Sequence, residues 1–294
     1  MAVLLGARTQ LITIPITVSQ TWTPPLNGTA VIHVIGAGGS GEVDDQHANS
    51  AGVAASRGTA GGGAGGYCSK TVTISTGTNW TFVVGAGGLR ESGDAVGVTG
   101  GNSTATNGAI STMTANGGVG GSVGGDNVGG AGGTASNGDV NRTGGAGGGY
   151  GSQQDHRFGG GGAVGIHGTG AAGVIGIGNN GAGNKFNGGT SDVLSPQFEN
   201  TYGALVGGGP AGQMVSLDTT PVKQNIFPGN GQNGGFLSGG GGAYSKHSAV
   251  VIYGGDGGIG GGGGSSYSSN GSIMRGVSGK GGNGLIIVMY LTIG

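Results

Sequence analysis

Glycine recurs at every third position in the middle of this chain. In the segment 117–133, GGVGGSVGGDNVGGAGG, one three-residue frame is glycine throughout except at Asn127. The glycines of that frame are Gly118, Gly121, Gly124, Gly130 and Gly133. A period of three matches an extended left-handed helix with three residues per turn and no internal hydrogen bonds. Such a helix must find backbone partners on neighbouring segments, and glycine lets those backbones approach closely.

The same spacing returns late in the chain, at Gly254, Gly257 and Gly260. Collagen solves the same problem with abundant proline, but this chain has only 7 prolines and no strict repeat. We therefore predict a bundle of short polyglycine II-type helices, cross-linked by backbone hydrogen bonds and joined by variable loops. At about 3.1 Å per residue, a twelve-residue run would span roughly 37 Å.

Clear strand-like segments flank the glycine-rich middle. Glycine accounts for 82 of 294 residues, which is typical of low-complexity disordered chains. However, charged residues make up only 8%, too few to keep a disordered chain solvated. Segments rich in Val, Ile and Thr predict strands, at 10–18, 29–35, 70–75, 79–84, 248–253 and 284–292. The predicted fold class is mostly β and irregular, with β-sandwich-like strands from both chain ends plus the polyglycine bundle.

These signals divide the chain into regions. We assign 1–25 to a β-like N-terminal attachment or oligomerisation segment and 26–294 to a single glycine-rich domain. Within that domain, 26–90 and 248–292 form a β base. The polyglycine-helix body covers about 100–265.

Charge and hydropathy exclude several classes of protein. The formal net charge of −1 provides no electrostatic footprint for nucleic acid or an anionic membrane. No apolar run approaches the roughly 20 residues of a membrane span, and the start MAVLLGARTQ lacks the features of a signal peptide. The single cysteine, Cys68, cannot form a disulfide within the chain. We therefore expect no nucleic-acid partner and no membrane insertion.

One segment has the glycine spacing of a nucleotide-binding motif: TAVIHVIGAGGSG places Gly36, Gly38 and Gly41 after an apolar strand. A dinucleotide fingerprint needs a helix directly after its glycines, to hold the pyrophosphate. The sequel EVDDQHANSAG has no helical period, and the phrase returns in FVVGAGGLRESG at 82–93. Because the phrase occurs twice, we interpret it as a structural element of the fold, and we expect no nucleotide cofactor.

The sequence gives little support for a metal site or a catalytic site. The histidines have no metal-ligand spacing, and the acidic group Glu42, Asp44 and Asp45 fits a solvated loop better than a cation site. No serine sits in a G-x-S-x-G elbow. We expect no enzymatic activity, no metal and no cofactor.

Recognition is indicated instead by the windows where glycine gives way to larger or charged side chains. Binding surfaces favour aromatic residues, Arg and His presented by a rigid scaffold. The candidate residues are Tyr150, His156, Arg157, Phe158, Phe198, Tyr202, Phe227, Phe236, Tyr244 and Tyr267. The alternative is that these aromatics fill small cores at the ends of the bundle.

The order of signals resembles a known family. QTWTPPLNGTAVIHVIGAGGSG is followed by GGGAGGYCSKTVTISTGTNWTFVVGAGG, then GGNSTA, and finally GGNGLIIVMYLT. This order resembles the glycine-rich domain of bacteriophage tail proteins, and the body is similar to the distal-tip adhesins of T-even-type phage long tail fibres. Those adhesins carry polyglycine helices whose loops contact the host surface. They also use an N-terminal helical hairpin for attachment, whereas residues 1–20 here look β-like.

The resemblance implies a tail-fibre or tail-tip adhesin that is made in the host cytoplasm, is exposed on the virion, and binds a host cell-surface receptor. A structural virion protein without receptor contact is the alternative, with the β-like ends 1–25 and 248–292 packing against another virion protein or forming a homo-oligomer. An ice-binding protein is a third interpretation, but the regular array of small or threonine side chains that it needs is not visible in the sequence.

Overall fold

The computed structural model describes residues 9–45, 59–93, 95–122, 129–149, 156–158, 160–161, 170, 172–173, 175–177, 233–234, 237, 239–240, 242–245, 251–268 and 276–293. Within these residues the chain forms strands and extended segments, and no helix. Candidate residues Tyr150, Phe198, Tyr202, Phe227 and Phe236 lie outside this part, as does Gly124.

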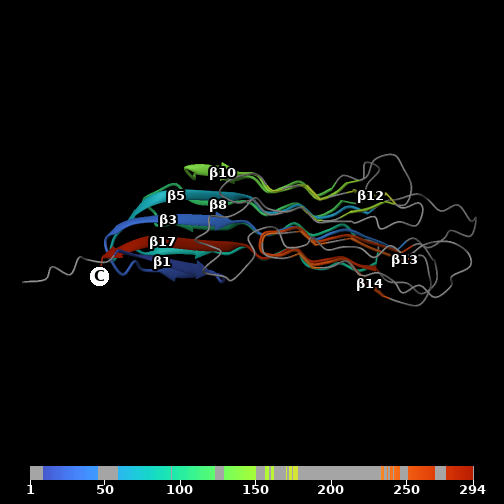
Figure 1. Ribbon diagram of the computed structural model, residues 1–294, viewed down its shortest axis with the longest axis horizontal. Helices are drawn as coiled ribbons and strands as arrows, with labels where there is room; N and C mark the ends of the chain where they lie inside the picture. The colour runs from blue at the N-terminus through green and yellow to red at the C-terminus, as the bar shows by residue number, and fades with distance from the viewer. Residues whose placement is uncertain are drawn as a thin grey trace, which may run out of the picture.

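Two five-stranded antiparallel sheets form one half of the molecule (Figure 1). The first sheet has the order β1 (Thr9–Ile16), β17 (Leu285–Ile293), β3 (Gly28–Ile35), β5 (Tyr67–Ile74) and β10 (Val140–Arg142). The second has the order β2 (Gln20–Trp22), β6 (Trp80–Val83), β7 (Ser103–Thr106), β8 (Met113–Ala115) and β9 (Ala135–Ser136). The strand expectation is confirmed, because antiparallel sheets built from both chain ends dominate the described residues.

One hydrophobic core lies between the two sheets. Alternation with period two turns Ile32 and Val34 of β3 inward, and the same rule applies to Trp80 and Phe82 of β6. The core residues are Ile16, Ala30, Ile32, Val34, Cys68, Val72, Ile74, Trp80, Phe82, Ala105, Met113, Ala115, Ile286, Val288 and Tyr290. Both sheets therefore depend on this shared interior.

Trp80 is the largest fully buried side chain, and its truncation should weaken the sheets strongly. We expect Trp80→Ala to lower the free energy of unfolding by about 3–5 kcal/mol, because it leaves a cavity beside Phe82. The indole Nε1 is buried and has no hydrogen-bond partner in the described structure. Trp80→Phe should therefore cost much less, since it removes no bond. Urea denaturation of both variants checks the difference; equal losses would contradict it.

The outer face of the first sheet carries a second, smaller core. Ile35, Tyr67, Leu285 and Ile287 are buried there against Leu237. His33, on the same face of β3, is only 5% exposed. Its Nδ1 lies 2.7 Å from the Tyr67 hydroxyl oxygen. A titratable ring is thus enclosed among apolar side chains.

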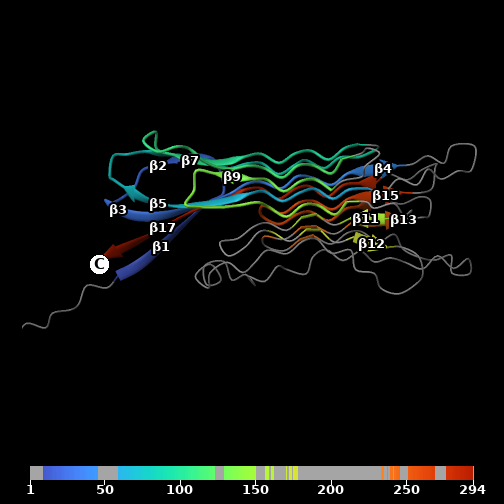
Figure 2. The ribbon, with the colours of Figure 1, turned by 90° about the horizontal axis from the view of Figure 1, so that it is seen from above.

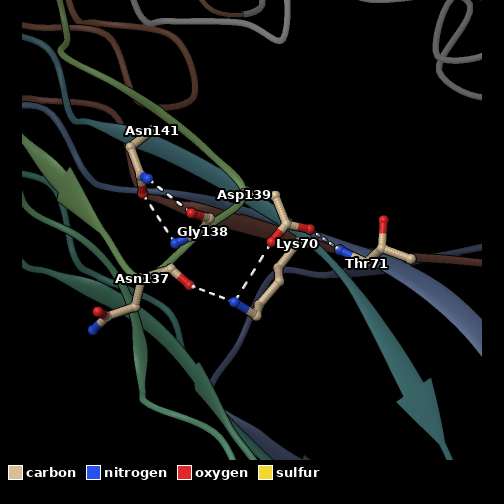
Figure 3. A network of polar contacts seen from close by, with 6 residues as sticks. All are labelled: Lys70, Thr71, Asn137, Gly138, Asp139 and Asn141. Atoms are coloured by element: carbon tan, nitrogen blue, oxygen red, sulfur yellow. Dashed lines mark hydrogen bonds and ion pairs between the residues drawn. The ribbon is translucent and has the colours of Figure 1, made fainter.

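The hairpin of β9 and β10 joins the two sheets, because β9 belongs to the second sheet and β10 to the first. Figure 3 shows its turn docked on β5. The Asp139 carboxylate accepts the Thr71 amide at 2.8 Å and lies 3.6 Å from Lys70 Nζ, which also donates to the Asn137 carbonyl. The Thr71 amide of β5 lies beyond the residues that pair with β10, and Asp139 gives it a hydrogen-bond partner. The turn therefore covers this part of the sheet edge.

Glycine-rich segments continue from the sheets as a bundle of parallel and antiparallel runs (Figures 1 and 2). Along the run 36–43, successive amides donate to three different neighbours in a repeating order. Residues 36, 39 and 42 donate to the run 60–66, residues 37, 40 and 43 to the run 95–101, and residues 38 and 41 to the run 279–284. The backbone direction therefore repeats every third residue.

The carbonyls of the same run accept from three more segments. These are 117–121, 260–266 and 85–88. The run 36–43 is thus surrounded by six others, and its residues 36–43 are all buried. At the glycine positions a side chain does not fit between such runs: a Cβ at Gly38 would overlap the carbonyl oxygen of Gly261. In another frame of the same run, the side chains of Ala37 and Ser40 are fully buried.

Strands and glycine runs alternate along the chain, so the two halves of the molecule are interleaved in sequence. The runs 36–43, 60–66 and 85–88 belong to the bundle, although the sequence pattern assigns 26–90 to the base. Conversely, β7 to β10 lie within the stretch assigned to the body but belong to the two large sheets. The chain passes repeatedly from a sheet strand into a run and back.

Candidate recognition site

The two ends of the described chain lie together, at one pole of the molecule. Thr9 of β1 pairs with Ile293 of β17, and the C-terminus stands at the outer end of the sheets (Figure 1). The opposite end of the glycine runs carries short strands, among them β12 (Ile175–Ile177) and β13 (Ala243–Ser245). We call these the chain-end pole and the distal pole.

A three-stranded parallel sheet stands at the distal pole. It consists of β13 (Ala243–Ser245), β15 (Ser266–Ser268) and β4 (Val43–Asp45). β4 continues the run 36–43 and β15 follows the run 260–266, so both runs end here. In the register, Tyr244 pairs with Tyr267, and Tyr267 pairs with Asp44. The fold thus brings together two predicted recognition residues that are far apart in sequence.

Three further candidates occupy a separate pair of strands. His156, Arg157 and Phe158 form β11, which pairs antiparallel with β12 (Ile175–Ile177). Figure 2 places β11, β12, β13, β15 and β4 at the same end of the bundle. These candidates therefore share the distal pole with Tyr244 and Tyr267, but they lie in another sheet.

A charged cluster that the sequence analysis missed lies beside β14 (Ile252–Tyr253) and β16 (Gly276–Val277). Arg90 Nη2 donates to Asp256 Oδ2 at 2.7 Å, and the Lys280 amide donates to Asp256 Oδ1 at 3.0 Å. The Arg90 guanidinium carbon stands 5.9 Å from the centre of the Tyr253 ring. The Arg90 side chain is 41% exposed and the Asp256 side chain 12%. An oriented guanidinium beside an aromatic ring is a common element of binding surfaces.

This cluster joins residues separated by 166 positions, so no local pattern could reveal it. One signal was available, because charged residues are only 8% of the chain and Arg90 stands two residues after the last glycine of a glycine run, Gly88. The segment that carries Arg90 has a second anchor, because the amide of the next residue, Glu91, donates to Ser278 Oγ at 2.9 Å. The cluster therefore fixes the segment 89–91 against the last runs of the bundle.

Among the described residues, no group of three or more His, Cys, Asp or Glu side chains could hold a metal ion. Burial raises the pKa of the Cys68 thiol to about 12, which keeps it protonated. Glu42 is buried and accepts the Ala60 amide at 2.8 Å. The described part of the chain has no helix long and apolar enough to cross a membrane.

The scaffold glycines lie at contacts between runs. A Cβ at Gly118 or Gly121 would overlap backbone of the run 60–66, and one at Gly130 or Gly133 would overlap backbone of the run 116–120. Likewise, a Cβ at Gly254 or Gly257 would overlap the run 261–264. Gly260 has a φ of 67° and occupies a turn, where glycine avoids steric strain.

Comparison with protein families gives one match: residues 15–291 fit a family described as a glycine-rich domain. The match spans both large sheets and the glycine bundle. The chain belongs to the glycine-rich domain family. No curated protein matches its sequence. The glycine-rich domain therefore includes the distal sheet and the Arg90 cluster as well as the strands at the chain-end pole.

Proposed function

We propose that this glycine-rich domain protein is a bacteriophage tail-fibre or tail-tip adhesin, which binds a host cell-surface receptor through its distal pole. The observation that carries the proposal is the separation of the poles: both chain ends pair in one sheet, while the predicted recognition residues that are described lie at the other end of the bundle. An adhesin needs this arrangement, with attachment to the particle at one end and an exposed surface at the other.

We also infer that the glycine runs are polyglycine II-type helices. The supporting observation is the period of three in their hydrogen bonds, since such a helix has three residues per turn and sends each successive amide in a new direction. Six neighbours around the run 36–43 match hexagonal packing of these helices. Many backbone hydrogen bonds between runs, each worth roughly 0.5–1.5 kcal/mol, compensate for the large entropy cost of ordering glycine.

A rigid bundle supports binding at its tip because it holds short strands in fixed positions without conformational cost on association. Tyr244 and Tyr267 are aligned by register at the end of two runs. The half-exposed Arg90 adds a charged group, held by the ion pair to Asp256, and the half-exposed Tyr253 ring beside it adds an aromatic group. We assign these residues to the receptor-binding surface, with a binding rather than a catalytic role.

The test is the binding of labelled, purified protein to susceptible bacteria and to resistant mutants that lack the receptor. We expect saturable binding to the susceptible cells only. The double variant Tyr244→Ala, Tyr267→Ala should bind at least about tenfold more weakly with an unchanged melting temperature, because aromatic anchors dominate interfaces. Val119→Ala, on the side of the bundle, is the matched control and should bind like the parent. Equal binding to both cell types would overturn the proposal.

A structural role in the virion, without receptor contact, is the second candidate. Exposed apolar side chains near the chain-end pole favour it: Leu11 is 40% exposed, and Leu291, its partner in the register, 59%. Such a surface would pack against another tail protein or a second copy. Immunogold labelling of intact particles separates the two roles. An adhesin must be labelled at an exposed tip, whereas a structural component would be labelled in the tail body or remain covered.

A further inference from the structure

Within the described residues, the two large sheets have four edge strands, which differ in length and charge. β2 and β9, at the edges of the second sheet, have 3 and 2 residues. β10, at one edge of the first sheet, has 3 residues, and its turn places the ion pair of Lys70 and Asp139 beside it. β1, at the other edge, has 8 residues and no charge (Figure 1). Short strands and charged side chains commonly protect a sheet edge, and β1 has neither protection.

The direction of the β1 backbone groups follows from the register of the first sheet. Successive residues of a strand turn their amides and carbonyls to opposite neighbours. Directly after β3, the Gly36 amide donates to the carbonyl of Gly66, directly before β5, at 2.9 Å. Even-numbered residues of β3 therefore face β5, and odd-numbered ones face odd-numbered residues of β17. Even-numbered residues of β17 then bond to even-numbered residues of β1, as Val288 does to Ile14. The odd-numbered residues of β1 direct their backbone groups away from the sheet.

This outward frame consists of Thr9, Leu11, Thr13 and Pro15. In the part of the chain that the structure describes, no strand pairs with β1 on this side, and Leu11 and Thr13 have no other backbone hydrogen bond. Leu11 and Pro15 are exposed. Because proline has no N–H, the donors of this edge are the amides of Thr9, Leu11 and Thr13. Leu11 is the central one of the three.

An exposed pair of leucines lies at the same place. Leu11 is 40% exposed, and Leu291, opposite it in β17, is 59% exposed. Neither β1 nor β17 carries a charged side chain, so two copies of this edge would not repel each other. The edge thus combines open backbone groups and exposed apolar side chains, both centred on Leu11.

We propose that β1 pairs antiparallel with β1 of a second copy of this chain, about a two-fold axis at Leu11. Five strands from each copy then form one sheet of ten. In this register Leu11 lies opposite Leu11 of the second copy, and Thr9 lies opposite Thr13. Three outward amides from each copy give six hydrogen bonds between the copies. Pro15 lies beyond the pairing, so its missing N–H costs nothing.

The exposed leucines favour a second copy over an unrelated strand. Across the two-fold axis, Leu291 and Leu11 continue into Leu11 and Leu291 of the second copy, in one row on one face of the joined sheet. Cross-strand neighbours on one face are in contact, so each exposed leucine pair covers an identical pair. The inference concerns the chain-end pole and does not depend on receptor binding.

Thr13→Pro removes an outward donor and leaves the pairing of β1 with β17 intact, because the Thr13 amide faces away from β17. Pro15 shows that this frame of the strand accepts proline. Thr13→Val, which keeps the amide, is the matched control. Sedimentation velocity over a hundredfold range of concentration should show dimers of the parent and of T13V, and at least about tenfold weaker association of T13P. A parent that stays monomeric, or T13P that associates like T13V, would overturn the proposal.

A second pair of variants tests the register and remains informative if T13P does not keep the circular dichroism spectrum of the parent. In the proposed pairing the two Cα atoms at position 11 stand about 5.5 Å apart, a distance that a disulfide spans. Those at position 13 are four residues apart along the strands, about 13 Å. The native Cys68 is fully buried and does not compete.

After mild oxidation, L11C should give a dimer on non-reducing electrophoresis that a reductant reverses, whereas T13C should stay largely monomeric. Cross-linking of L11C alone supports the proposed pairing. Equal cross-linking of both variants, or of neither, contradicts it. Cell binding is measured separately, so failure of the adhesin role would leave these results unchanged.

Discussion

The double variant Gly118→Ala, Gly121→Ala should fail to form the glycine bundle. At each position the new Cβ would overlap the backbone of the run 60–66, at the Gly63 and Ala60 carbonyls. Relief requires the two runs to separate, which would break the bonds from the Gly63 and Gly66 amides to the run 116–119. A buried amide without a partner costs roughly 1–3 kcal/mol. Several such losses are comparable with the whole stability of a domain, about 5–15 kcal/mol.

We expect little soluble protein from this variant, rapid proteolysis within the glycine runs and no cooperative thermal transition by circular dichroism. Val119→Ala is the matched control, because it changes a half-exposed side chain in the same run and should alter stability by no more than about 0.5 kcal/mol. Gly28→Ala is a second control, in β3 outside the bundle, where a Cβ would meet only the Leu26 Cδ1 atom at 3.2 Å. A double variant that melts like the parent would contradict the close packing of the runs.

Acidification should destabilise the protein through His33. Burial lowers the pKa of this imidazole from 6.5 to about 4 in the folded state. Between these values the unfolded chain binds a proton that the folded chain excludes, so stability rises with pH in this window. The contribution is fully present above about pH 6.5 and is lost as the pH falls toward 4. At 1.36 kcal/mol per pKa unit, the loss amounts to about 3 kcal/mol.

Denaturant titrations at pH 7.0, 5.5 and 4.0 measure this effect. Other groups also titrate in the range, so the informative quantity is the difference between the parent and His33→Gln. The glutamine keeps a polar group near the Tyr67 hydroxyl, 2.7 Å from the native Nδ1, but does not titrate. We expect the parent to lose about 3 kcal/mol more than the variant between pH 7 and pH 4. Parallel pH profiles would show that His33 is accessible to protons in the folded state.

The sequence predicted the strands closely because their signals are local. The expected segments 29–35 and 284–292 correspond to β3 (Gly28–Ile35) and β17 (Leu285–Ile293) within one residue. Period-two alternation of β-branched residues indicates a half-buried strand wherever it pairs. The GAGG phrases at 36–39 and 85–88 were correctly read as parts of the fold, since both lead from a strand into a glycine run.

The candidate site was predictable only in part. Tyr244 and Tyr267 stand out as aromatic residues among glycines, but their pairing depends on which runs are neighbours in the bundle. The Arg90–Asp256 ion pair is likewise set by the packing of the segment 89–91 against the last runs. His33 gave no signal of burial, because a strand exposes alternate faces and only the neighbouring elements decide which face is covered.

The sequence by itself determined the local geometry of this protein: where strands form, and where the absence of a Cβ lets the backbone pass close to a neighbour. The strands follow from steric limits that act within a few residues, and the close approach is open to glycine because it has no side chain. Only the tertiary structure decided which runs adjoin, that β1 and β17 bring both chain ends to one pole, and that Val119 faces outward while Gly118 and Gly121 face inward. The reason is physical. Backbone amides and carbonyls are chemically alike at every residue, so hydrogen bonding between glycine runs carries no information about which run is the partner. That choice comes from the sheets, whose shared core fixes where each run begins.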